Sequence, residues 1–384
     1  MKIVNICLNS VVTKGFSYQD NLLSKYQHKL GNDVTIITNL YYYDQHGQLL
    51  KLDKRIQEYD QGVKIIRIPN KHGTTFKSTF KRYVNFISIL EQEKPDIIFL
   101  HSCQFVDVNQ VVKYVKKHKN VTLYVDNHAD YSNSARSWLS KNVLHKIIWR
   151  HYAKIINPYV KKFYGVLPAR VDFLIDLYKL PQNKCELLVM GADDELVKKS
   201  KLLNLRNEIR AKYKILNDDF LIVTGGKIDL EKKQTILLME AVKKISNPKI
   251  KLIFFGSVVK ELKPRIEKLT QDCDNILYIG WISSELSYDY FEAADLVVFP
   301  GRHSVFWEQV VGQGKPMIVK YWNGTTHVDL GGNVEFIYND SVEEIEEKLL
   351  EVMQPNVISR MKEIAEQKGM QFFSYKEIAK RSID

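Results

Sequence analysis

The chain has 384 residues, of which 45% are hydrophobic and 26% are charged, and its formal net charge at pH 7 is +11. This composition is typical of a globular protein and excludes a disordered or fibrous chain, while the length predicts two domains. The basic charge favours an anionic partner, which can be nucleic acid, a phosphorylated substrate or a membrane surface. Four cysteines without CxxC spacing indicate a reducing compartment and no metal site.

The first residues, MKIVNICLNS, predict a strand, and they lack the long apolar segment and the small-residue cleavage site of a signal peptide. No apolar stretch approaches the ~20 residues that a membrane-spanning helix needs. We therefore expect a cytoplasmic protein, and its basic charge allows peripheral binding at the inner face of the cell membrane.

The first half alternates strands with helices. In chain order, the predicted strands are residues 2–8, 34–38, 63–68, 97–101, 121–125, 163–167 and 185–189. The predicted helices are residues 17–30, 76–92, a stretch ending near residue 119, 134–162 and 171–180. Residues 41–61 are predicted to be a polar loop that can hold an edge hairpin.

The second half repeats this alternation after a Lys- and Asn-rich segment, residues 194–217, which predicts a linker and a first helix. The predicted strands are residues 220–224, 251–255, 276–279, 296–299, 317–320 and 334–338. The predicted helices begin near residues 232, 284, 304, 342, 357 and 374. Alternation of this kind is typical of α/β proteins with parallel sheets, so two βαβ-type halves are predicted.

Two glycine segments follow predicted strands, where ligands of α/β proteins bind. Gly15 follows the first strand and can either let a phosphate approach the backbone or form a plain turn. Gly225, Gly226 and Lys227 follow the strand 220–224, and Lys232 begins the next helix. Glycines with convergent lysines favour a phosphate clamp, although exposed lysines are also common without a ligand.

Residues 294–317, ADLVVFPGRHSVFWEQVVGQGKPM, predict a buried strand, a turn at Pro300–Gly301 and a helix that begins near Ser304. The unpaired N–H groups at such a helix start favour an anion such as a pyrophosphate. Glu308 lies one helical turn further on, where its carboxylate can reach a ribose hydroxyl. The alternative is that Glu308 is a solvated helix residue.

His128 follows the strand 121–125 within the polar run 126–130. At the carboxyl end of a parallel strand, a histidine can orient a sugar hydroxyl or hydrogen-bond to it. The alternative is a loop histidine bonded to Asp126 or Asp130. The position favours the functional interpretation.

The predicted helix 134–162 interleaves apolar residues such as Trp138 and Ile147 with many lysines and arginines. This pattern is typical of a helix at an anionic membrane surface. It equally fits a core helix with a basic solvated face. Nucleic-acid binding would need exposed aromatic residues at strand or loop positions, which the pattern does not suggest.

Together these motifs resemble the retaining glycosyltransferases of the GT-B fold, in particular glycosyltransferase family 4 and its relatives. The similar segments of the second half are 226–228 with Lys232 (G-R-L-x3-K), 252–256, 278–282 (F-x-G), 293–300 (A-D-x3-x-P) and 308–316 (E-A-M-x3-G-x-P). In the first half and at the end of the chain they are Gly15, 94–96 (K-P-D), His128, 191–193 (N-G-V-D) and 373–375 (F-S-W).

The resemblance implies two Rossmann-like domains that face each other across a cleft. Residues 1–193, completed by the helix 373–384, would bind the acceptor, and residues 194–372 would bind the nucleotide-sugar donor. The expected activity is transfer of a sugar, with retention, from a nucleotide-diphosphate sugar to a hydroxyl acceptor. No metal or other cofactor is expected, since lysines can supply the charge that the departing diphosphate needs.

The resemblance also implies roles for single residues. Lys227 and Lys232 would hold the donor diphosphate, and Glu308 would bind the donor ribose. The segment with Trp281 would meet the nucleotide base, and His128 would lie beside the transferred sugar.

One departure concerns the family's Glu-x7-Glu pattern, because Pro300 stands where its first glutamate is expected. His303 and Ser304 can contact the donor phosphates or sugar in its place, and amides near Ser304 and Val305 can stabilise the diphosphate. The donor sugar therefore does not follow from the resemblance, and loss of catalysis stays open.

A basic first half suits a lipid-linked glycan acceptor at an anionic membrane, as in bacterial capsule, O-antigen or exopolysaccharide synthesis. Two alternatives remain. A GT-B nucleotide-sugar 2-epimerase would share the fold but needs acid/base groups and no acceptor site. A non-catalytic GT-B partner subunit would explain the missing glutamate. The basic aromatic helix argues against the first alternative. The second is opposed by the residues that are retained, which are Lys227, Lys232, Glu308 and His128.

Overall fold

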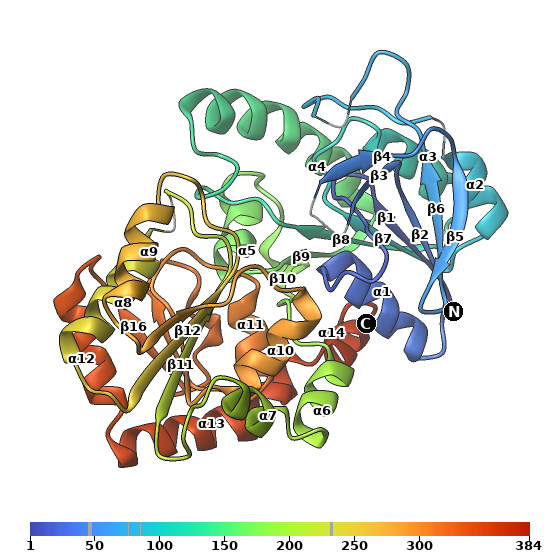
Figure 1. Ribbon diagram of the computed structural model, residues 1–384. Coiled ribbons are helices and arrows are strands. Elements are labelled where there is room, and N and C mark those ends of the chain that lie inside the picture. Colours follow the sequence, from blue (N-terminus) through green and yellow to red (C-terminus); the bar gives the residue numbers. More distant parts are fainter. Residues whose placement is uncertain (45–47, 76, 85, 231–232) are drawn as a thin grey trace. The chain divides into compact units, whose positions relative to one another are not determined.

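The computed structural model describes residues 1–44, 48–75, 77–84, 86–230 and 233–384. Within them the chain forms two compact units, and Figure 1 shows a sheet flanked by helices in each. Unit 1 comprises residues 1–189 and 378–384, and unit 2 comprises residues 190–377. The last residues of the chain therefore belong to the unit that its first residues build.

Unit 1 is built on an eight-stranded sheet with the spatial order β10-β9-β8-β7-β1-β2-β6-β5. Its strands are β1 (Lys2–Cys7), β2 (Asp33–Asn39), β5 (Ile56–Asp60), β6 (Val63–Ile68), β7 (Ile97–His101), β8 (Thr122–Asn127), β9 (Val160–Gly165) and β10 (Cys185–Leu187). All of them pair in parallel except β5, which runs antiparallel along the edge of β6. The predicted loop 41–61 thus contains this edge strand and a short hairpin, β3 (Tyr41–Tyr43) with β4 (Leu49–Lys51).

The helices of unit 1 are shorter than the sequence predicts. They are α1 (Gln19–Lys29), α2 (Ile87–Glu93), α3 (Val108–Lys117), η1 (Ser140–Trp149), α4 (Arg150–Ile156), η2 (Asn157–Tyr159), α5 (Pro168–Asp176) and η3 (Gln182–Lys184). The predicted helix 76–92 is wrong over residues 77–84, which form turns. Tyr83 is the physical reason: its buried ring donates its hydroxyl to the Leu8 carbonyl, and its amide donates to Asp107 Oδ2 at 2.6 Å. These tertiary contacts override the local helical pattern.

The predicted long helix 134–162 is a continuous helical segment in which η1, α4 and η2 follow one another directly, and the strand β9 already begins at Val160. Trp149 and Ile156 are buried in the core, but Trp138 is 73% exposed and Leu139 63% exposed. The interpretation as a core helix therefore holds for the second half of the segment, and the membrane interpretation stays a prediction. Its second half packs into unit 1, and its first half carries exposed apolar side chains next to lysines.

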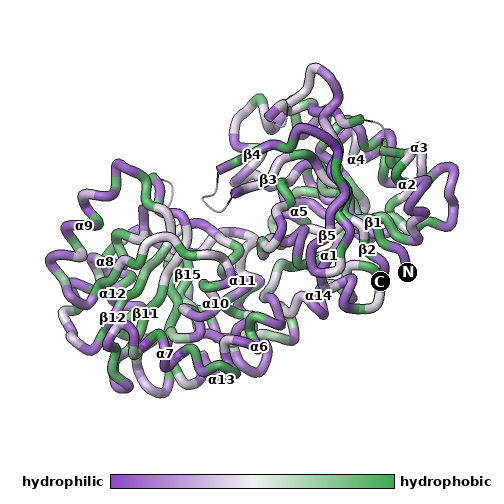
Figure 2. The backbone as a smooth tube through the Cα atoms, turned by 45° about the vertical axis from the view of Figure 1, so that its right-hand side comes forward, coloured by the Kyte–Doolittle hydropathy of each residue, from purple (hydrophilic) through white to green (hydrophobic). Residues whose placement is uncertain are grey.

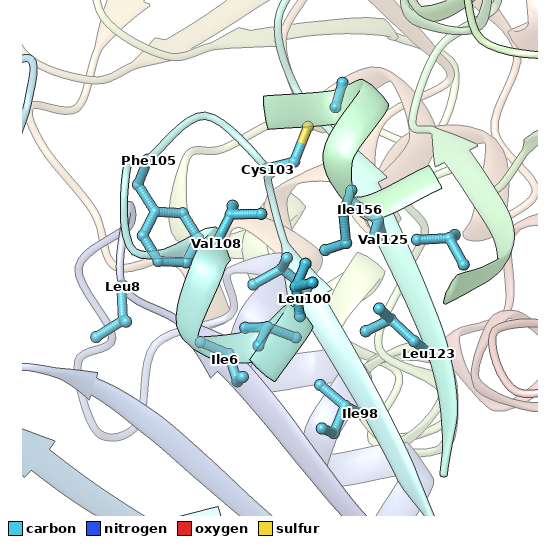
Figure 3. Packing of buried hydrophobic residues seen from close by; sticks show 14 of the residues in the cluster. Ile6, Leu8, Ile98, Leu100, Cys103, Phe105, Val108, Leu123, Val125 and Ile156 are labelled. Atoms are coloured by element: carbon cyan, nitrogen blue, oxygen red, sulfur yellow. The ribbon is translucent and has the colours of Figure 1, made fainter. Parts of the chain in front are cut away.

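The core of unit 1 lies between the sheet and the helices beside it (Figure 3). Ile98 and Leu100 of β7 point to the same face of the sheet, because successive strand residues point to opposite faces and these two are separated by one residue. On that face they meet Val108 at the start of α3 and Ile156 at the end of α4. This packing holds the carboxyl ends of β7 and β8, and the loops that follow them, in place.

Unit 2 is a six-stranded, fully parallel sheet with the order β13-β12-β11-β14-β15-β16. Its strands are β11 (Phe220–Gly225), β12 (Ile250–Phe255), β13 (Ile276–Tyr278), β14 (Leu296–Phe299), β15 (Met317–Lys320) and β16 (Val334–Ile337). The central residues of the inner strands β11, β12, β14 and β15 are mostly buried, as in other parallel sheets covered on both faces, whereas the edge strands β13 and β16 are partly exposed. Figure 2 colours the backbone of this sheet by hydropathy.

The helices of unit 2 largely follow the predicted order. They are α6 (Asp194–Leu202), α7 (Leu205–Lys212), α8 (Gln234–Ile245), α9 (Lys263–Gln271), α10 (Ser284–Ala293), α11 (Phe306–Gly312), η4 (Thr326–Val328), α12 (Val342–Val352), α13 (Pro355–Phe373) and α14 (Tyr375–Arg381), which continues into unit 1. The sequence reading missed α9, although Leu262, Ile266 and Leu269 have helical spacing and pack against the core. None of the helices in the described ranges is both long and apolar enough to cross a membrane.

Asp295 ties the two central strands of unit 2 together at their amino ends. Its Oδ2 accepts the amide of Leu221 at 2.8 Å, and its own amide donates to the Leu221 carbonyl at 2.9 Å. Arg206 and Arg210 contact its two oxygens at 2.6 and 3.1 Å. The aspartate of the A-D-x3-x-P segment therefore serves the fold, because ligands bind at the opposite, carboxyl ends of the strands.

Each sheet has a point where the strand order reverses, between β7 and β1 in unit 1 and between β11 and β14 in unit 2. Loops that leave the sheet at such a point diverge, and ligands of α/β proteins bind in the resulting crevice. The two points define where a functional site is expected in each unit.

Candidate active site

The loops after β11 and β12 touch each other backbone to backbone. Gly226 has φ +119° and Gly256 has φ +126°, which side-chain-bearing residues rarely adopt. A Cβ on Gly256 would lie 1.8 Å from the Gly226 carbonyl oxygen. The amide of Ile228 donates to the Ser257 carbonyl at 2.8 Å and continues this contact. The glycines of the G-R-L-like segment thus allow the close approach of two loops beside the reversal point.

One of the two predicted phosphate ligands, Lys227, lies at this end of the sheet, in the loop after β11. Lys227 is exposed and forms an ion pair of 3.4 Å with Asp229. Lys232 lies outside the described residues. Trp281 follows β13 by three residues and is 63% exposed, so its ring is accessible to a ligand. Lys227 and Trp281 thus lie on the loops after β11 and β13, which are the loops expected to hold a nucleotide.

The helix after β14 begins at Phe306, two residues later than predicted. The Ser304 carbonyl accepts the amide of Trp307 at 2.9 Å, and Val305, which precedes the helix, is exposed. Glu308 therefore lies in the first turn of α11. Its exposed fraction is 0%, so the alternative interpretation as a solvated helix residue is wrong.

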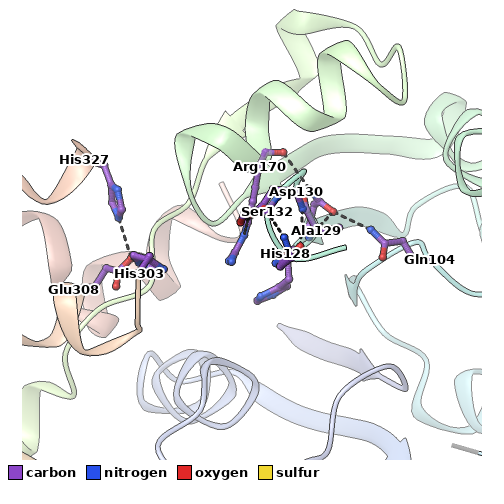
Figure 4. Close-up of polar contacts among 11 residues, drawn as sticks. Gln104, His128, Ala129, Asp130, Ser132, Arg170, His303, Glu308 and His327 are labelled. Carbon is purple, nitrogen blue, oxygen red and sulfur yellow. Dashed lines mark hydrogen bonds and ion pairs between the residues drawn. The ribbon is translucent and has the colours of Figure 1, made fainter. Parts of the chain in front are cut away.

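Two histidines converge on one oxygen of Glu308 (Figure 4). His303 Nε2 lies 2.8 Å from Glu308 Oε1, and His327 Nε2 lies 2.9 Å from the same atom. His303 comes from the loop after β14, and His327 comes from η4 in the loop after β15. Three neighbouring segments of unit 2 thus build one buried cluster at the carboxyl end of the sheet.

The histidines keep Glu308 ionised. Burial alone would raise the pKa of its carboxyl group, but the His303 charge and the hydrogen bonds from both rings outweigh burial and lower that pKa. Among the described residues, Glu308 Oε2 and His327 Nδ1 are buried without a hydrogen-bond partner. An ionised carboxylate with one unused oxygen can accept a hydrogen bond from a ligand hydroxyl.

The spacing of these three side chains also resembles a metal-ligand set, since their ligand atoms lie within 4.8 Å of one another. A histidine bound to metal through Nε2 carries its proton on Nδ1 and normally donates it to an acceptor. The described residues offer His327 Nδ1 no such acceptor. The two Nε2 atoms lie 2.8 and 2.9 Å from Glu308 Oε1, which are ordinary hydrogen-bond distances, so the side chains fit a form in which Nε2–H of both rings donates to Glu308.

In unit 1, His128 is part of a second cluster that lies at the ends of β7 and β8. Its Nε2 is 3.2 Å from Asp126 Oδ2, and its side chain is partly exposed. The same Asp126 oxygen lies 2.9 Å from His101 Nδ1, which is also 3.0 Å from Asp20 Oδ1. One N–H cannot align with both oxygens, so the buried His101 is held mainly by the two negative charges.

The charges of this cluster stabilise one another against burial. Burial would lower the pKa of His101, but the Asp126 and Asp20 carboxylates outweigh it and raise that pKa well above its usual value. Burial raises the pKa of the Cys7 thiol to about 12, so this thiol stays protonated. A protonated His101 between two carboxylates leaves Asp126 able to accept from His128.

The loop that carries His128 is held firmly (Figure 4). Asp130 Oδ1 accepts the amide of Ser132 at 2.7 Å, and Asp130 Oδ2 accepts from Arg170 Nε at 3.1 Å. The alternative partner for His128, Asp130, is therefore already used, and Asp126 is the carboxylate that His128 meets. Gly15 lies apart from this loop, with φ +72° and its amide 3.0 Å from Asp60 Oδ2.

Sequence reasoning missed three members of these clusters: Asp20, His101 and His327. His101 ends a predicted strand, so the rule that selected His128 could also have selected it. Asp20 lies in a helix and His327 in an irregular loop, and neither position carries a periodic or spacing signal. Only the fold brings them to Asp126 and Glu308.

One family model and one relative match parts of the chain. Residues 205–310, all in unit 2, match the family Glycosyl transferases group 1. A Klebsiella pneumoniae protein described as an uncharacterized 41.2 kDa protein in cps region is 22% identical over 240 residues. This match spans 62% of the chain and 62% of that relative, which is less than two thirds of its length.

Solved structures match over the whole chain. A glycosyltransferase from Rickettsia africae has a TM-score of 0.69 at 13% identity, covering 100% of this chain and 96% of its own. The Anabaena protein HepE, solved in complex with UDP-glucose, has a TM-score of 0.66 at 13% identity, covering 100% and 98%. At such identities the similarity shows the fold.

Two Rossmann-like units with parallel sheets, matched throughout by glycosyltransferase structures, define the GT-B fold. Within this class, residues 205–310 match the family Glycosyl transferases group 1, as the resemblance predicts for the second half of the chain. The predicted fold class is thereby confirmed.

Proposed function

We propose that the protein transfers a sugar, with retention, from a nucleotide-diphosphate sugar to a hydroxyl acceptor. The observation that carries this proposal is the buried, ionised Glu308 with one unused oxygen, next to the reversal point of the sheet in unit 2. A ribose offers two hydroxyl donors to such an oxygen. The UDP-glucose bound in HepE supports a nucleotide sugar as the donor class.

The remaining donor contacts come from the loops around Glu308. Lys227 and Lys232 bind the diphosphate, and the Trp281 segment meets the base. His303, with the amides of Ser304 and Val305, faces the phosphates or the sugar. These groups stabilise the charge that gathers on the departing diphosphate, which is the main demand of the reaction.

His128 acts on the sugar side of the reaction in unit 1. Asp126 holds its Nε2 at 3.2 Å, which fixes the ring orientation and leaves Nδ1 for a sugar hydroxyl. Gly15, with an open left-handed backbone, lets the donor or acceptor approach the loop after β1. With Pro300 in place of the first family glutamate, His128 and His303 carry more of the sugar recognition.

The acceptor in this proposal is a lipid-linked glycan of a bacterial surface polysaccharide such as capsule, and the enzyme works on the cytoplasmic face of the membrane. Trp138, Leu139 and Ile147 are exposed in the first part of the 134–162 segment, with Lys141 and Lys146 among them. Exposed apolar side chains beside lysines suit an anionic lipid surface. The cps-region relative supports a role in capsule synthesis.

A donor panel tests the activity. Purified full-length protein is incubated with UDP-, GDP-, ADP- and dTDP-sugars, with and without a bacterial membrane extract, and nucleotide release and lipid-extractable sugar are measured. We expect release from one nucleotide class, stimulated by the extract. A net interconversion of the donor sugar without transfer would favour the epimerase, and neither binding nor turnover of any donor would favour the partner subunit.

The membrane part has its own test in vesicle flotation at low salt. The protein is expected to float with vesicles that contain anionic lipid, and Trp138→Ser with Leu139→Ser is expected to weaken binding about tenfold or more, because two apolar side chains no longer enter the interface. Leu202→Ser is the matched control, since Leu202 is equally exposed in unit 2. Equal flotation of all variants would contradict the proposed surface.

A further inference from the structure

We propose that His327 is a positioning residue that fixes Glu308 so that its Oε2 atom faces the donor. This inference rests on the proposed function, because it names the group that prepares the donor-binding carboxylate. Nothing in the sequence motifs marks His327, which lies 19 residues beyond Glu308.

The two hydrogen bonds to Glu308 leave its oxygens unequal. Oε1 receives Nε2–H groups from His303 and His327 at 2.8 and 2.9 Å, whereas Oε2 has no partner among the described residues. A carboxylate oxygen has about two lone-pair positions, so two donors saturate Oε1. A ligand hydroxyl must then meet Oε2.

The two histidines differ in how firmly they are held. The His327 side chain is 4% exposed, while that of His303 is 12% exposed. His327 sits in η4, whose end is fixed by Asn333 Nδ2 donating to the Val328 carbonyl at 3.1 Å. The His327 ring also lies 6.1 Å from the ring of Phe373. His327 is therefore the rigid donor, and His303, on the loop before α11, is the one that can turn toward a ligand.

The consequence is a carboxylate whose orientation is set before the donor binds. Without the His327 hydrogen bond, Oε1 loses one donor and the carboxylate can rotate, so both oxygens compete for the ligand hydroxyls. Preorganised hydrogen bonds to a charged group are worth more than those that must order on binding. His327 itself does not contact the ligand in this proposal. Its loss is nevertheless expected to weaken recognition of the ribose hydroxyls, because Glu308 is no longer held in place.

The experiment measures binding of a nucleoside diphosphate to the full chain by calorimetry. UDP or GDP is used, whichever binds. Its affinity is compared with the affinities of its 2′-deoxy and 3′-deoxy analogues. Wild type is expected to prefer the ribose form by about 10- to 100-fold, as for one hydrogen bond to a charged group. His327→Leu should lose most of this preference. His327→Gln should keep it, because its amide nitrogen can take the place of the imidazole Nε2–H.

A third variant and a control separate positioning from folding. His327→Asn is polar but too short to reach Glu308, so it should behave as His327→Leu does, and thermal unfolding checks that each variant is folded. His151→Leu, at an exposed histidine of unit 1, should leave the preference unchanged. In activity assays His327→Leu and His327→Asn should raise the KM for the donor more than they lower kcat, and His327→Gln should stay close to wild type.

Two outcomes distinguish this inference from the proposed function. If Glu308→Gln keeps the full preference for the ribose form, or if no nucleoside diphosphate binds, the donor assignment of Glu308 is itself wrong. If Glu308→Gln loses the preference while folded His327→Leu and His327→Asn retain it, the donor site stands and the positioning role of His327 is refuted.

Discussion

Replacing Glu308 by glutamine is expected to lower kcat/KM for the nucleotide-sugar donor by about 100-fold, because charged hydrogen bonds to two ribose hydroxyls are weakened, each worth about 1.5 kcal/mol or more. The amide keeps the size of the buried side chain and can still accept from one histidine, so the fold should persist. Steady-state kinetics with varied donor, together with thermal unfolding, measure both effects.

The control for this prediction is Glu240→Gln on α8, a glutamate that pairs with Arg265 away from the cluster. Its kinetics should match wild type. A Glu308→Gln enzyme with unchanged kcat/KM would show that the carboxylate does not contact the donor. A donor KM that rises while kcat stays constant would indicate that Glu308 contributes to donor binding in the ground state and the transition state alike.

Replacing Asp295 by alanine is expected to destabilise unit 2 by about 3–5 kcal/mol, the usual cost of breaking a buried ion pair. Arg210, whose side chain is 4% exposed, would keep its buried positive charge without the neighbouring carboxylate. The Leu221 amide would lose the oxygen that accepts its hydrogen bond. Chemical denaturation of wild type and variant measures the difference. Asp218→Ala removes an exposed ion pair with Lys249 in the same unit and should change stability little.

The pH dependence of this contribution has a definite sign. Burial would raise the pKa of Asp295, but the Arg206 charge and the Leu221 amide outweigh it and hold the pKa below its usual value. A carboxyl whose pKa is lower in the folded state stabilises fully above its unfolded pKa, about 4, and loses this effect as the pH falls further. The difference in free energy of unfolding between wild type and Asp295→Asn should therefore be largest at neutral pH and should decrease below about pH 4. A difference that grows in acid would contradict the assignment.

Much of the fold could be predicted because buried parallel strands are short apolar runs that few other structures can explain. The strands around Ile98 and Val297 are examples, each placed within two residues of its observed bounds. The failures have a common cause. The first part of the predicted helix 76–92 forms turns because Tyr83 bonds to Leu8, 75 residues away, and no local pattern reports such a contact.

The candidate site divides in the same way. Glu308 and His128 could be predicted because they follow strand ends at recognisable distances, and strand ends carry the ligands of this fold class. Their partners could not. His327 reaches Glu308 from an irregular loop, and Asp20 reaches His101 from a helix of a different βα unit. A spacing rule describes neighbours along the chain, whereas these partners are neighbours only across the sheet.

The return of residues 378–384 to unit 1 makes that unit depend on contacts between distant parts of the sequence. The carbonyls of Arg381 and Asp384 accept hydrogen bonds from the hydroxyls of Tyr164 and Tyr124, each at 2.9 Å, across 217 and 260 residues of sequence. Because all of unit 2 lies between these partners in the sequence, forming the contacts closes a loop that contains a whole unit. The fold of unit 1 is therefore discontinuous in sequence, and loss of residues 378–384 would take two acceptors from it.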